Sequence, residues 1–273
     1  MSAPLPHLAL IGFGEAGSTF ARAGGWGDAA RGWDVLPGRR AAMAECGITA
    51  AASAEEALAG ASLALALVTA DTALDAARDY ARFLRPGAIW CDMNSVAPET
   101  KRGAAKAIGE AGGRYVDVAV MAPVDPAALS VPLLLAGPAA GEAMDLLNAL
   151  GFAKTRIVGD EIGRASAIKM IRSVMVKGIE ALSWECAEAA RAAGVLDEVT
   201  ASLDASEKQS PWAERFAYNR ERMEHHGARR AAEMEESAKT LLDLGVEPVM
   251  TRGTVIRQRD AAAKNKAKRN EAA

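Results

Sequence analysis

Near its amino terminus the chain reads HLALIGFGEAGSTF (residues 7–20), an apolar run followed at once by a glycine-rich turn and a helical segment. Residues 12–17 match the pattern G-x-G-x-x-G. In this pattern Gly12 permits a tight turn, Gly14 lets the backbone approach a pyrophosphate, and Gly17 lets the helix pack closely on the strand. The free N–H groups at the helix start would bind the anion, because the helix dipole favours negative charge there. A turn without a ligand is the alternative, which the flanking strand and helix disfavour.

The candidate cofactor-binding residues of this turn are Gly12, Phe13, Gly14, Glu15, Ala16 and Gly17. The second strand should end in the residue that reads the adenosine ribose, and Asp34 follows Gly17 at close to the usual offset of about twenty residues. A carboxylate there accepts hydrogen bonds from both ribose hydroxyls and repels a 2′-phosphate. Arg39 and Arg40 could instead hold that phosphate, or form a solvated helix start. The sequence therefore favours NAD as the cofactor and leaves NADP open.

Short apolar runs alternate with longer, alanine-rich segments of helical character over the first 160 residues. We expect strands at residues 7–11, 32–36, 63–68, 88–91, 115–118, 131–135 and 155–158. Amphipathic segments such as 71–84 and 98–111 lie between them. This alternation, with strands that are apolar throughout, predicts a parallel sheet covered by helices on both faces. The first 160 residues are thus expected to form an α/β Rossmann domain.

The sequence pattern changes after Gly163, where the alternation of short apolar runs and helical segments ends. Residues 164–193 contain no proline and one glycine, Gly178, which predicts one long helix ended by Gly194. Its apolar residues recur at three- and four-residue steps and form a single stripe: Ile168, Ile171, Met175, Ile179 and Leu182. Further helices are expected, with Pro211 and Pro248 near their starts. The predicted domains are a dinucleotide-binding domain over 1–160 and an all-α domain over 161–260, joined through the long helix, with a disordered tail over 261–273.

Composition excludes several classes of protein. Half of the 273 residues are hydrophobic and the formal net charge is −3, which argues against a disordered chain and against a basic nucleic-acid binder. Three cysteines are too few for a disulfide scaffold, and three histidines without ligand spacing give no support for a metal site. No signal peptide or membrane-spanning run is evident. We expect a cytoplasmic protein without a bound metal.

A lysine opens the long helix, at Lys169 in the stretch GRASAIKM (residues 163–170). Lysines on helices are usually solvated, which is the alternative to a functional role. Three other segments precede it in order: GFGEAG (12–17), DMNSVAP (92–98) and DVAVM (117–121). Together the four segments resemble the β-hydroxyacid dehydrogenase family, which includes 3-hydroxyisobutyrate and 6-phosphogluconate dehydrogenases. The helical half is similar to a less characterised branch of that family.

The resemblance implies an NAD(P)-dependent oxidoreductase that transfers hydride between nicotinamide and an alcohol or carbonyl carbon. It implies a homodimer whose active site lies between the domains. The family's catalytic lysine maps onto Lys169, and its serine segment maps onto Asn94 and Ser95, with Asn94 beside the cofactor. Val68 and Thr69 would also pass beside the cofactor. Lys169 would act as base in oxidation and as acid in reduction, while Ser95 holds the substrate oxygen. Asn94 could alternatively cap the helix that begins near Pro98.

Two residues depart from the family's pattern. Met121 stands where the family usually has a serine that helps to bind a substrate carboxylate, and Ser173 stands where it has an asparagine one turn after the lysine. Ser173 can still donate a hydrogen bond and is kept as a catalytic and substrate-binding candidate. Met121 and Ala122 make the expected pocket more apolar, which favours a bulkier or less acidic substrate than 3-hydroxyisobutyrate.

The helical half is expected to supply specificity. Arg229 could bind a substrate carboxylate or phosphonate, although a basic pair with Arg230 at a helix start is more often solvated. His225 and His226 precede Gly227, so a loop is expected there. Two other functions stay open: reduction of a C=N bond, as in imine reductases, and binding of a nucleotide without turnover. Imine reductases usually carry another residue at the lysine position, so Lys169 argues against the first. No nucleic-acid or membrane partner is expected.

Overall fold

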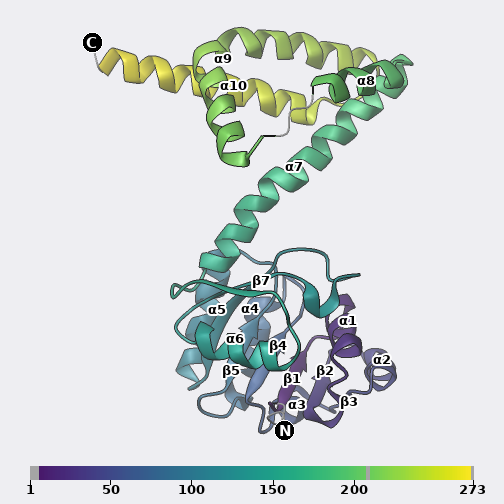
Figure 1. Cartoon of the computed structure of the whole chain (residues 1–273), viewed down its shortest axis with the longest axis vertical. Coiled ribbons are helices and arrows are strands. Elements are labelled where there is room, and N and C mark those ends of the chain that lie inside the picture. The colour runs from purple at the N-terminus through teal and green to yellow at the C-terminus, as the bar shows by residue number, and fades with distance from the viewer. Residues whose placement is uncertain (1–5, 207–209, 272–273) are drawn as a thin grey trace. The chain divides into compact units, whose positions relative to one another are not determined.

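The computed structural model describes residues 6–206 and 210–271. The chain divides into two compact units, residues 1–173 and 174–273, and each is described by itself (Figure 1). The first unit contains the sheet together with the first turns of the long helix. The boundary between the two compact units in the sequence falls after residue 173, inside that helix. The predicted domain limit at 160/161 stays a prediction.

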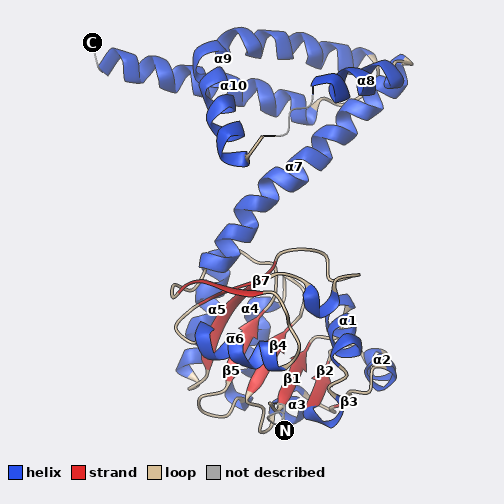
Figure 2. Cartoon of the chain, in the orientation of Figure 1, coloured by secondary structure: helices blue, strands red, loops and turns tan. Residues whose placement is uncertain are grey.

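The first unit is built on one sheet of eight strands in the order β3-β2-β1-β4-β5-β6-β7-β8 (Figure 2). The strands are β1 Leu8–Ile11, β2 Ala30–Trp33, β3 Thr49–Ala50, β4 Leu63–Ala66, β5 Ile89–Asp92, β6 Arg114–Val120, β7 Leu133–Ala136 and β8 Thr155–Gly159. The seven expected strands are present. The short β3 was missed, because two residues carry no readable pattern. β2 ends before Val35 and Leu36, whose apolar side chains are exposed beyond the strand.

Helices cover both faces of the sheet, as the unbroken apolar strands predict. In β1 the residues Leu8 and Leu10 face one apolar core, while Ala9 and Ile11 face the other. Side chains of α1 (Glu15–Gly24), α2 (Arg39–Glu45) and α6 (Ala140–Ala149) fill the first core. Those of α3 (Ala54–Leu58), α4 (Ala73–Tyr80) and α5 (Pro98–Glu110) fill the second. The carboxyl ends of the parallel strands between these two layers form the edge at which a ligand is expected.

Two strands, β7 and β8, run against the predicted direction. β7 pairs antiparallel with β6, Val120 opposite Leu133, whereas an all-parallel sheet was expected. The connection between them contains only the short 3₁₀ turn Ala128–Ser130. A parallel crossover usually contains a helix that packs on the sheet, and residues 121–132 form none beyond this turn, so the connection returns the chain antiparallel. β8 then pairs parallel with β7.

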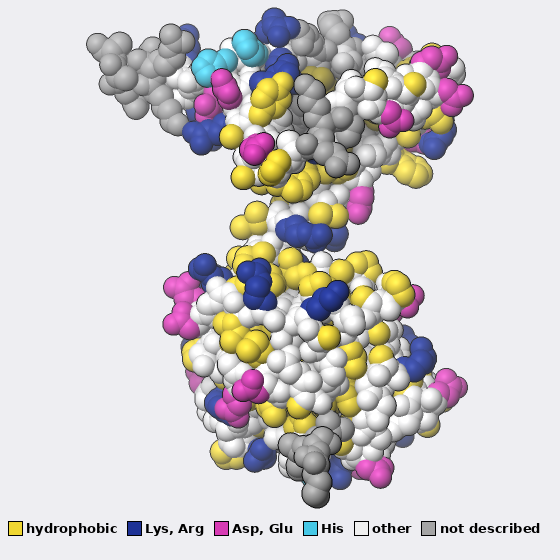
Figure 3. Space-filling model, viewed as in Figure 1, with side chains coloured by type: hydrophobic (Ala, Val, Ile, Leu, Met, Phe, Trp, Pro, Cys, Tyr) yellow, Lys and Arg dark blue, Asp and Glu magenta, His cyan; other side chains and the backbone are white. Residues whose placement is uncertain are grey.

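The long helix α7 spans Arg164–Ala193, as predicted. Gly194 follows with φ of 71°, a left-handed conformation that suits glycine and ends the helix. The apolar stripe lies on the surface of this chain, where hydrophobic side chains gather along the helix (Figure 3). Ile171 is 73% exposed, and Ile179 and Leu182 are each 46% exposed. The stripe therefore offers a surface for another molecule rather than a core position.

The second unit is helical, as predicted. It contains the end of α7 together with α8 (Leu196–Ser206), α9 (Trp212–Asp243) and α10 (Val249–Glu271). Pro211 directly precedes α9, and Pro248 directly precedes α10, which confirms both expected helix starts. Within residues 6–206 and 210–271, no helix combines the length and the apolar content needed to cross a membrane.

The sequence misled us at three places in this unit. His225 and His226 do not lie in a loop, and Arg229 does not lie at a helix start, because α9 continues through all of them. Gly227 is a helical position whose missing side chain allows close packing: a Cβ there would lie 2.2 Å from the carbonyl oxygen of Gln258 in α10. Residues 261–271, expected to be disordered, belong to α10, where Asn265 donates a hydrogen bond to the carbonyl oxygen of Glu224.

A buried carboxylate ties α7 to the start of α10 within the second unit. Glu185 accepts hydrogen bonds from the N–H groups of Met250 and Thr251 and from the hydroxyl of Thr251, at 2.6 to 2.9 Å. Burial alone would raise the pKa of Glu185, but these hydrogen bonds together hold it below its usual value. The ionised carboxylate thus caps α10.

Replacing Glu185 by alanine is expected to cost about 1–3 kcal/mol of unfolding free energy, because the buried N–H group of Thr251 and the part-buried N–H group of Met250 lose their acceptor. The ionised form is the stabilising one, so the contribution is present above the pKa of the unfolded state and is lost as the pH falls through the lowered pKa of the folded state. Urea unfolding at pH 7 and at acidic pH would measure both effects. An unchanged stability difference on acidification would contradict the capping role.

Candidate active site

The glycine turn has the geometry that its pattern predicts. Gly12 has φ of 93°, and a Cβ there would lie 2.6 Å from the carbonyl oxygen of Leu67, so only glycine fits this crossing of the turn over β4. A Cβ at Gly17 would lie 2.8 Å from the carbonyl oxygen of Gly12. At Gly14, in contrast, a Cβ would meet no atom within 4 Å. This open space above the start of α1 is a cradle that a side chain would fill, and it suits an anion bound to backbone N–H groups.

Asp34 holds the turn from the end of β2. Its carboxylate oxygens accept hydrogen bonds from the N–H groups of Phe13, at 2.7 Å, and Leu36, at 2.8 Å. The Phe13 side chain itself is fully buried, so this residue contributes its backbone to the turn. Asp34 is therefore placed and oriented at the glycine turn, where a ribose-binding residue is expected.

A cavity of about 350 Å³ opens beside Asp34. Its lining includes residues that the sequence predicted: Gly12, Gly14, Asp34, Arg39, Val68 and Thr69. It also includes residues that were missed, among them Trp33, Thr72, Asp75, Asp79 and Tyr80. Burial raises the pKa of Tyr80, and the nearby carboxylates of Asp79 and Asp34 raise it further. The size, aromatic wall and position of the cavity suit an adenosine.

A second cavity, also of about 350 Å³, adjoins the first, since Leu67 and Val68 line both. Its other lining residues are Glu15, Ala16, Ala70, Met93, Asn94, Ser95, Val120, Ala122, Pro123, Val124 and Lys169. The two cavities thus follow the carboxyl ends of β1, β4, β5 and β6 in one line. An extended ligand with its pyrophosphate at Gly14 would reach from one cavity into the other.

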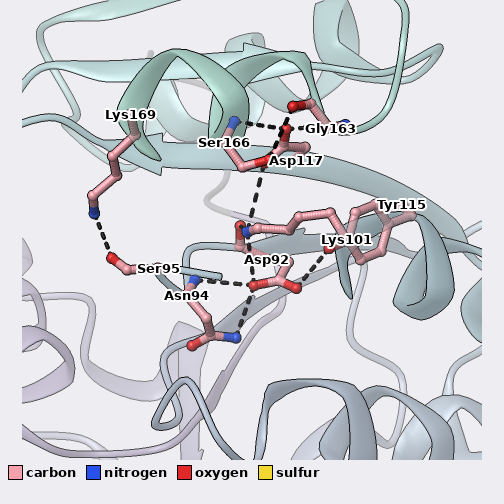
Figure 4. Close-up of polar contacts among 9 residues, drawn as sticks. All are labelled: Asp92, Asn94, Ser95, Lys101, Tyr115, Asp117, Gly163, Ser166 and Lys169. Atoms are coloured by element: carbon pink, nitrogen blue, oxygen red, sulfur yellow. Dashed lines mark hydrogen bonds and ion pairs between the residues drawn. The ribbon is translucent and has the colours of Figure 1, made fainter. Parts of the chain in front are cut away.

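Lys169 and Ser95 meet in the second cavity (Figure 4). The ammonium nitrogen of Lys169 donates a hydrogen bond of 2.5 Å to the hydroxyl oxygen of Ser95. Lys169 stands on the second turn of α7 and is half-buried, whereas Ser95 is exposed in the segment that follows β5. An ammonium and a hydroxyl at this distance can both donate hydrogen bonds to a third oxygen placed beside them, and the ammonium can transfer a proton to that oxygen.

Asn94 does not cap a helix, which was the alternative role considered for it. The N-cap of α5 is Ala97, without a side-chain hydrogen bond. The backbone and side-chain N–H groups of Asn94 instead donate to the carboxylate of Asp92, at 2.9 and 2.8 Å. Its amide oxygen is buried, and the described residues offer it no hydrogen-bond partner. An acceptor of this kind at the cavity wall suits a ligand donor such as a carboxamide.

The remaining candidates lie in different places. Met121 packs against the small apolar cluster of Ala119, Leu134, Ala136 and Ala165, while Ala122 and Pro123 line the cavity. Ser173 follows Lys169 by one turn of α7. Arg229 belongs to the second unit and stays a prediction.

Sequence reasoning missed a buried polar cluster behind the cavity, drawn in Figure 4. Lys101 of α5 lies between Asp92 of β5 and Asp117 of β6, and all three side chains are buried. The hydroxyl of Tyr115 donates a hydrogen bond of 2.6 Å to Asp92. Burial, followed by the charge of Asp92, raises the pKa of Tyr115 well above its ordinary value. One signal was available: Lys101 shares the inward face of α5 with Ala104 and Ile108, where an apolar residue is expected.

Comparisons with known proteins agree with this geometry. Residues 7–153 match the NAD binding domain of 6-phosphogluconate dehydrogenase, and residues 190–261 match a domain of unknown function. A conserved hypothetical protein from Sinorhizobium meliloti is 37% identical, covering 96% of this chain and 90% of its own, with a TM-score of 0.63. A conserved protein of unknown function, described as structurally similar to 3-hydroxyacid dehydrogenases, is 30% identical, covering 94% of this chain and 98% of its own, with a TM-score of 0.61.

The fold is also that of an imine reductase from Myxococcus stipitatus, solved in complex with NADP⁺. That enzyme is 21% identical, with 95% of each chain covered and a TM-score of 0.77. A variant of it was solved in complex with NAD⁺. The present chain belongs to the family whose NAD-binding domain is that of 6-phosphogluconate dehydrogenase, which confirms the resemblance seen in the sequence. It is an NAD(P)-dependent oxidoreductase by family and fold, and the open cradle at Gly14, the oriented Asp34 and the two adjoining cavities fit its dinucleotide.

Proposed function

We propose that the protein transfers hydride between a nicotinamide dinucleotide and the carbon of an alcohol or carbonyl group, with Lys169 as the acid and base. The contact between Lys169 and Ser95, at 2.5 Å in the cavity next to the dinucleotide cavity, carries this proposal. Its two polar groups stand where the reacting oxygen of a substrate would lie, beside the end of the cofactor that is remote from Asp34.

Each residue of the candidate site would have its own role in the reaction. The bound dinucleotide would supply or accept the hydride. Ser95 accepts a hydrogen bond from Lys169 and keeps its own proton to donate to a carbonyl oxygen, which polarises the carbonyl bond. Lys169 would give a proton to that oxygen in reduction and remove it in oxidation. Asn94 would orient the nicotinamide carboxamide through its buried amide oxygen, and Ser173, one turn along α7, would contact the substrate.

The lining of the second cavity supports an apolar substrate. Val120, Ala122, Pro123 and Val124 form a wall without charge. We therefore propose a carbonyl compound that is bulkier or less acidic than 3-hydroxyisobutyrate. Arg229 of the second unit remains a candidate for binding an anionic group of this substrate.

Reduction of a C=N bond is the second candidate function. The likeness of fold to imine reductases favours it, whereas a lysine that can protonate an oxygen favours the alcohol and carbonyl reaction.

A spectrophotometric screen would test the proposal. Oxidation of NADH and NADPH would be followed with aldehydes, ketones and oxoacids, each with and without a primary amine. We expect turnover of carbonyl compounds without the amine. Turnover that requires the amine would support C=N reduction, and binding of NADH without turnover of any compound would support a nucleotide-binding protein.

The surroundings of the first cavity favour NAD over NADP. Asp34, Asp75 and Asp79 bring negative charge to its lining, against the single arginine Arg39. We expect kcat/KM to be higher with NADH than with NADPH by about tenfold or more, since placing a 2′-phosphate beside a carboxylate costs at least about 1.4 kcal/mol. Asp34→Asn keeps the shape and removes the charge, so it should narrow this ratio. Equal ratios in both proteins would contradict the role of Asp34.

The exposed apolar stripe of α7 supports a homodimer, as the family resemblance implies. Light scattering on the purified protein should give twice the chain mass, and Ile171→Glu, at a 73% exposed position, should shift the mass towards the monomer. A cytoplasmic location remains the prediction from the sequence.

A further inference from the structure

Behind the active-site cavity lie three charged side chains that the proposed reaction does not use. Asp92, Lys101 and Asp117 are 1%, 0% and 0% exposed. The Lys101 ammonium nitrogen lies 2.6 Å from the carbonyl oxygen of Asp92, 3.0 Å from its carboxylate and 3.6 Å from the carboxylate of Asp117. Burying two carboxylates with one ammonium is costly, and apolar residues of similar volume often stabilise a fold as well. The cluster therefore calls for a role besides stability.

The Asp92 end of the cluster holds the segment that carries Ser95. One carboxylate oxygen of Asp92 accepts both N–H hydrogen bonds of Asn94, and the other accepts the hydroxyl of Tyr115. Asn94 directly precedes Ser95, so the orientation of Asp92 determines where the Ser95 hydroxyl stands. The Lys101 ammonium in turn fixes Asp92, because it contacts both the carboxylate and the backbone carbonyl oxygen of Asp92.

The Asp117 end holds the start of α7. One carboxylate oxygen of Asp117 accepts hydrogen bonds from the N–H groups of Gly163, at 3.2 Å, and Ser166, at 3.0 Å. Gly163 directly precedes α7 and Ser166 belongs to its first turn, where the N–H groups have no partner within the helix itself. Lys169 follows Ser166 by three residues. Asp117 therefore sets the position from which the Lys169 side chain reaches Ser95.

We propose that Lys101 is a positioning residue, which joins Asp92 to Asp117 and thereby keeps Ser95 and Lys169 within hydrogen-bond reach of each other. The contacts form a closed ring: Ser95, Asn94, Asp92, Lys101, Asp117, the first turn of α7, and Lys169, which returns to Ser95. The proposal rests on the proposed function for what the pair does, and on these contacts for how the pair is held.

Two variants test the bridge. Lys101→Met removes the ammonium and keeps the chain length, and Lys101→Met/Asp117→Asn also removes the excess negative charge. We expect Lys101→Met to lower Tm, because it leaves the carboxylates of Asp92 and Asp117 buried together without the ammonium between them. The double variant should recover most of that loss, because Asp117→Asn removes the charge that repels Asp92. In both variants kcat should be lower by about 10²-fold, the cost of misplacing reacting groups by about 1 Å. The affinity for ADP-ribose, which lacks the nicotinamide that Asn94 would orient, should not change, since neither Asp92, Asn94 nor Lys101 lines the adenosine cavity.

The isotope effect separates positioning from loss of folded protein. With NADH deuterated at the transferred position, misalignment slows hydride transfer and raises the primary isotope effect on kcat in both variants. Ile108→Val, in the core on the same face of α5, is the matched control and should lower Tm without changing kcat or the isotope effect. A double variant with recovered Tm and the kcat of the wild type would overturn the proposal.

Hydrogen exchange gives a readout that needs no substrate. In Lys101→Met we expect faster exchange both in residues 92–97 and in residues 163–169, the second of which is hydrogen-bonded to Asp117 and not to Lys101. If the wild type turns over no compound, the proposed function fails, while this pattern still decides whether Lys101 holds the two segments together. Faster exchange confined to α5 would overturn the bridge.

Discussion

Replacing Lys169 by alanine is expected to lower kcat by about 10²- to 10⁴-fold, the usual contribution of a positioned acid or base. The affinity for NADH should stay the same, because the dinucleotide is held by the glycine turn and Asp34. Lys169→Met, which keeps most of the side-chain volume, should behave like Lys169→Ala, since the loss comes from the ammonium and not from packing. Steady-state kinetics together with a fluorescence titration of NADH would measure both quantities.

The control for this experiment is Lys106→Ala, which removes an exposed lysine of α5 whose partner is Glu110 at 3.9 Å. It should leave kcat unchanged. Ser95→Ala should retain more activity than Lys169→Ala, because Lys169 could still protonate the substrate oxygen directly. A Lys169→Ala variant with the kcat of the wild type would show that another group supplies the proton.

Gly14→Ala is expected to weaken binding of NADH with no loss of stability. A methyl group at Gly14 would meet no protein atom within 4 Å, so the fold accepts it. It would occupy the space into which the pyrophosphate must come, and loss of one charge-assisted hydrogen bond, worth about 1.5–3 kcal/mol, would raise Kd by about 10- to 100-fold. Calorimetric titration and a thermal melt of the free protein would measure the two effects separately.

Two other glycines provide comparison variants for Gly14→Ala. Gly109→Ala, on α5 and equally free of neighbours within 4 Å, should leave Kd unchanged and raise Tm slightly, because alanine favours a helix over glycine. Gly12→Ala should destabilise the first unit itself, since its Cβ would overlap the backbone of Leu67 at a φ of 93°. A Gly14→Ala protein that binds NADH as tightly as the wild type would contradict the placement of the pyrophosphate.

Much of the fold could be predicted because local patterns determine it. The glycine turn, the apolar strands and the proline-free segment at 164–193 each report a conformation that their own residues impose. The direction of β7 could not be read in this way, because it depends on how residues 121–132 connect two strands. The helical state of His225 and His226 was missed since Gly227 reads as a turn, and only the crossing with α10 explains a glycine inside a helix.

The same distinction between local patterns and contacts of distant segments applies to the candidate site. Lys169 and Ser95 were singled out because they lie in segments that resemble a family, and the structure places them in one cavity. Lys101 was missed because its meaning depends on burial between two carboxylates from different strands, and a lysine on a helix is ordinarily solvated. Trp33 and Tyr80 were missed because only the sheet brings the end of β2 beside α4.

The reversal at β7 has a consequence for how such a protein can acquire new substrates. Since β6 and β7 run in opposite directions, residues 121–132 leave the sheet and return to it at the same edge, next to Val120 and Leu133. Evolution can therefore lengthen, shorten or rebuild this excursion without shifting the register of any strand. The ladder from Asp117 to Val120 would remain a constant frame, while the chemistry displayed above it diversifies from one descendant to the next.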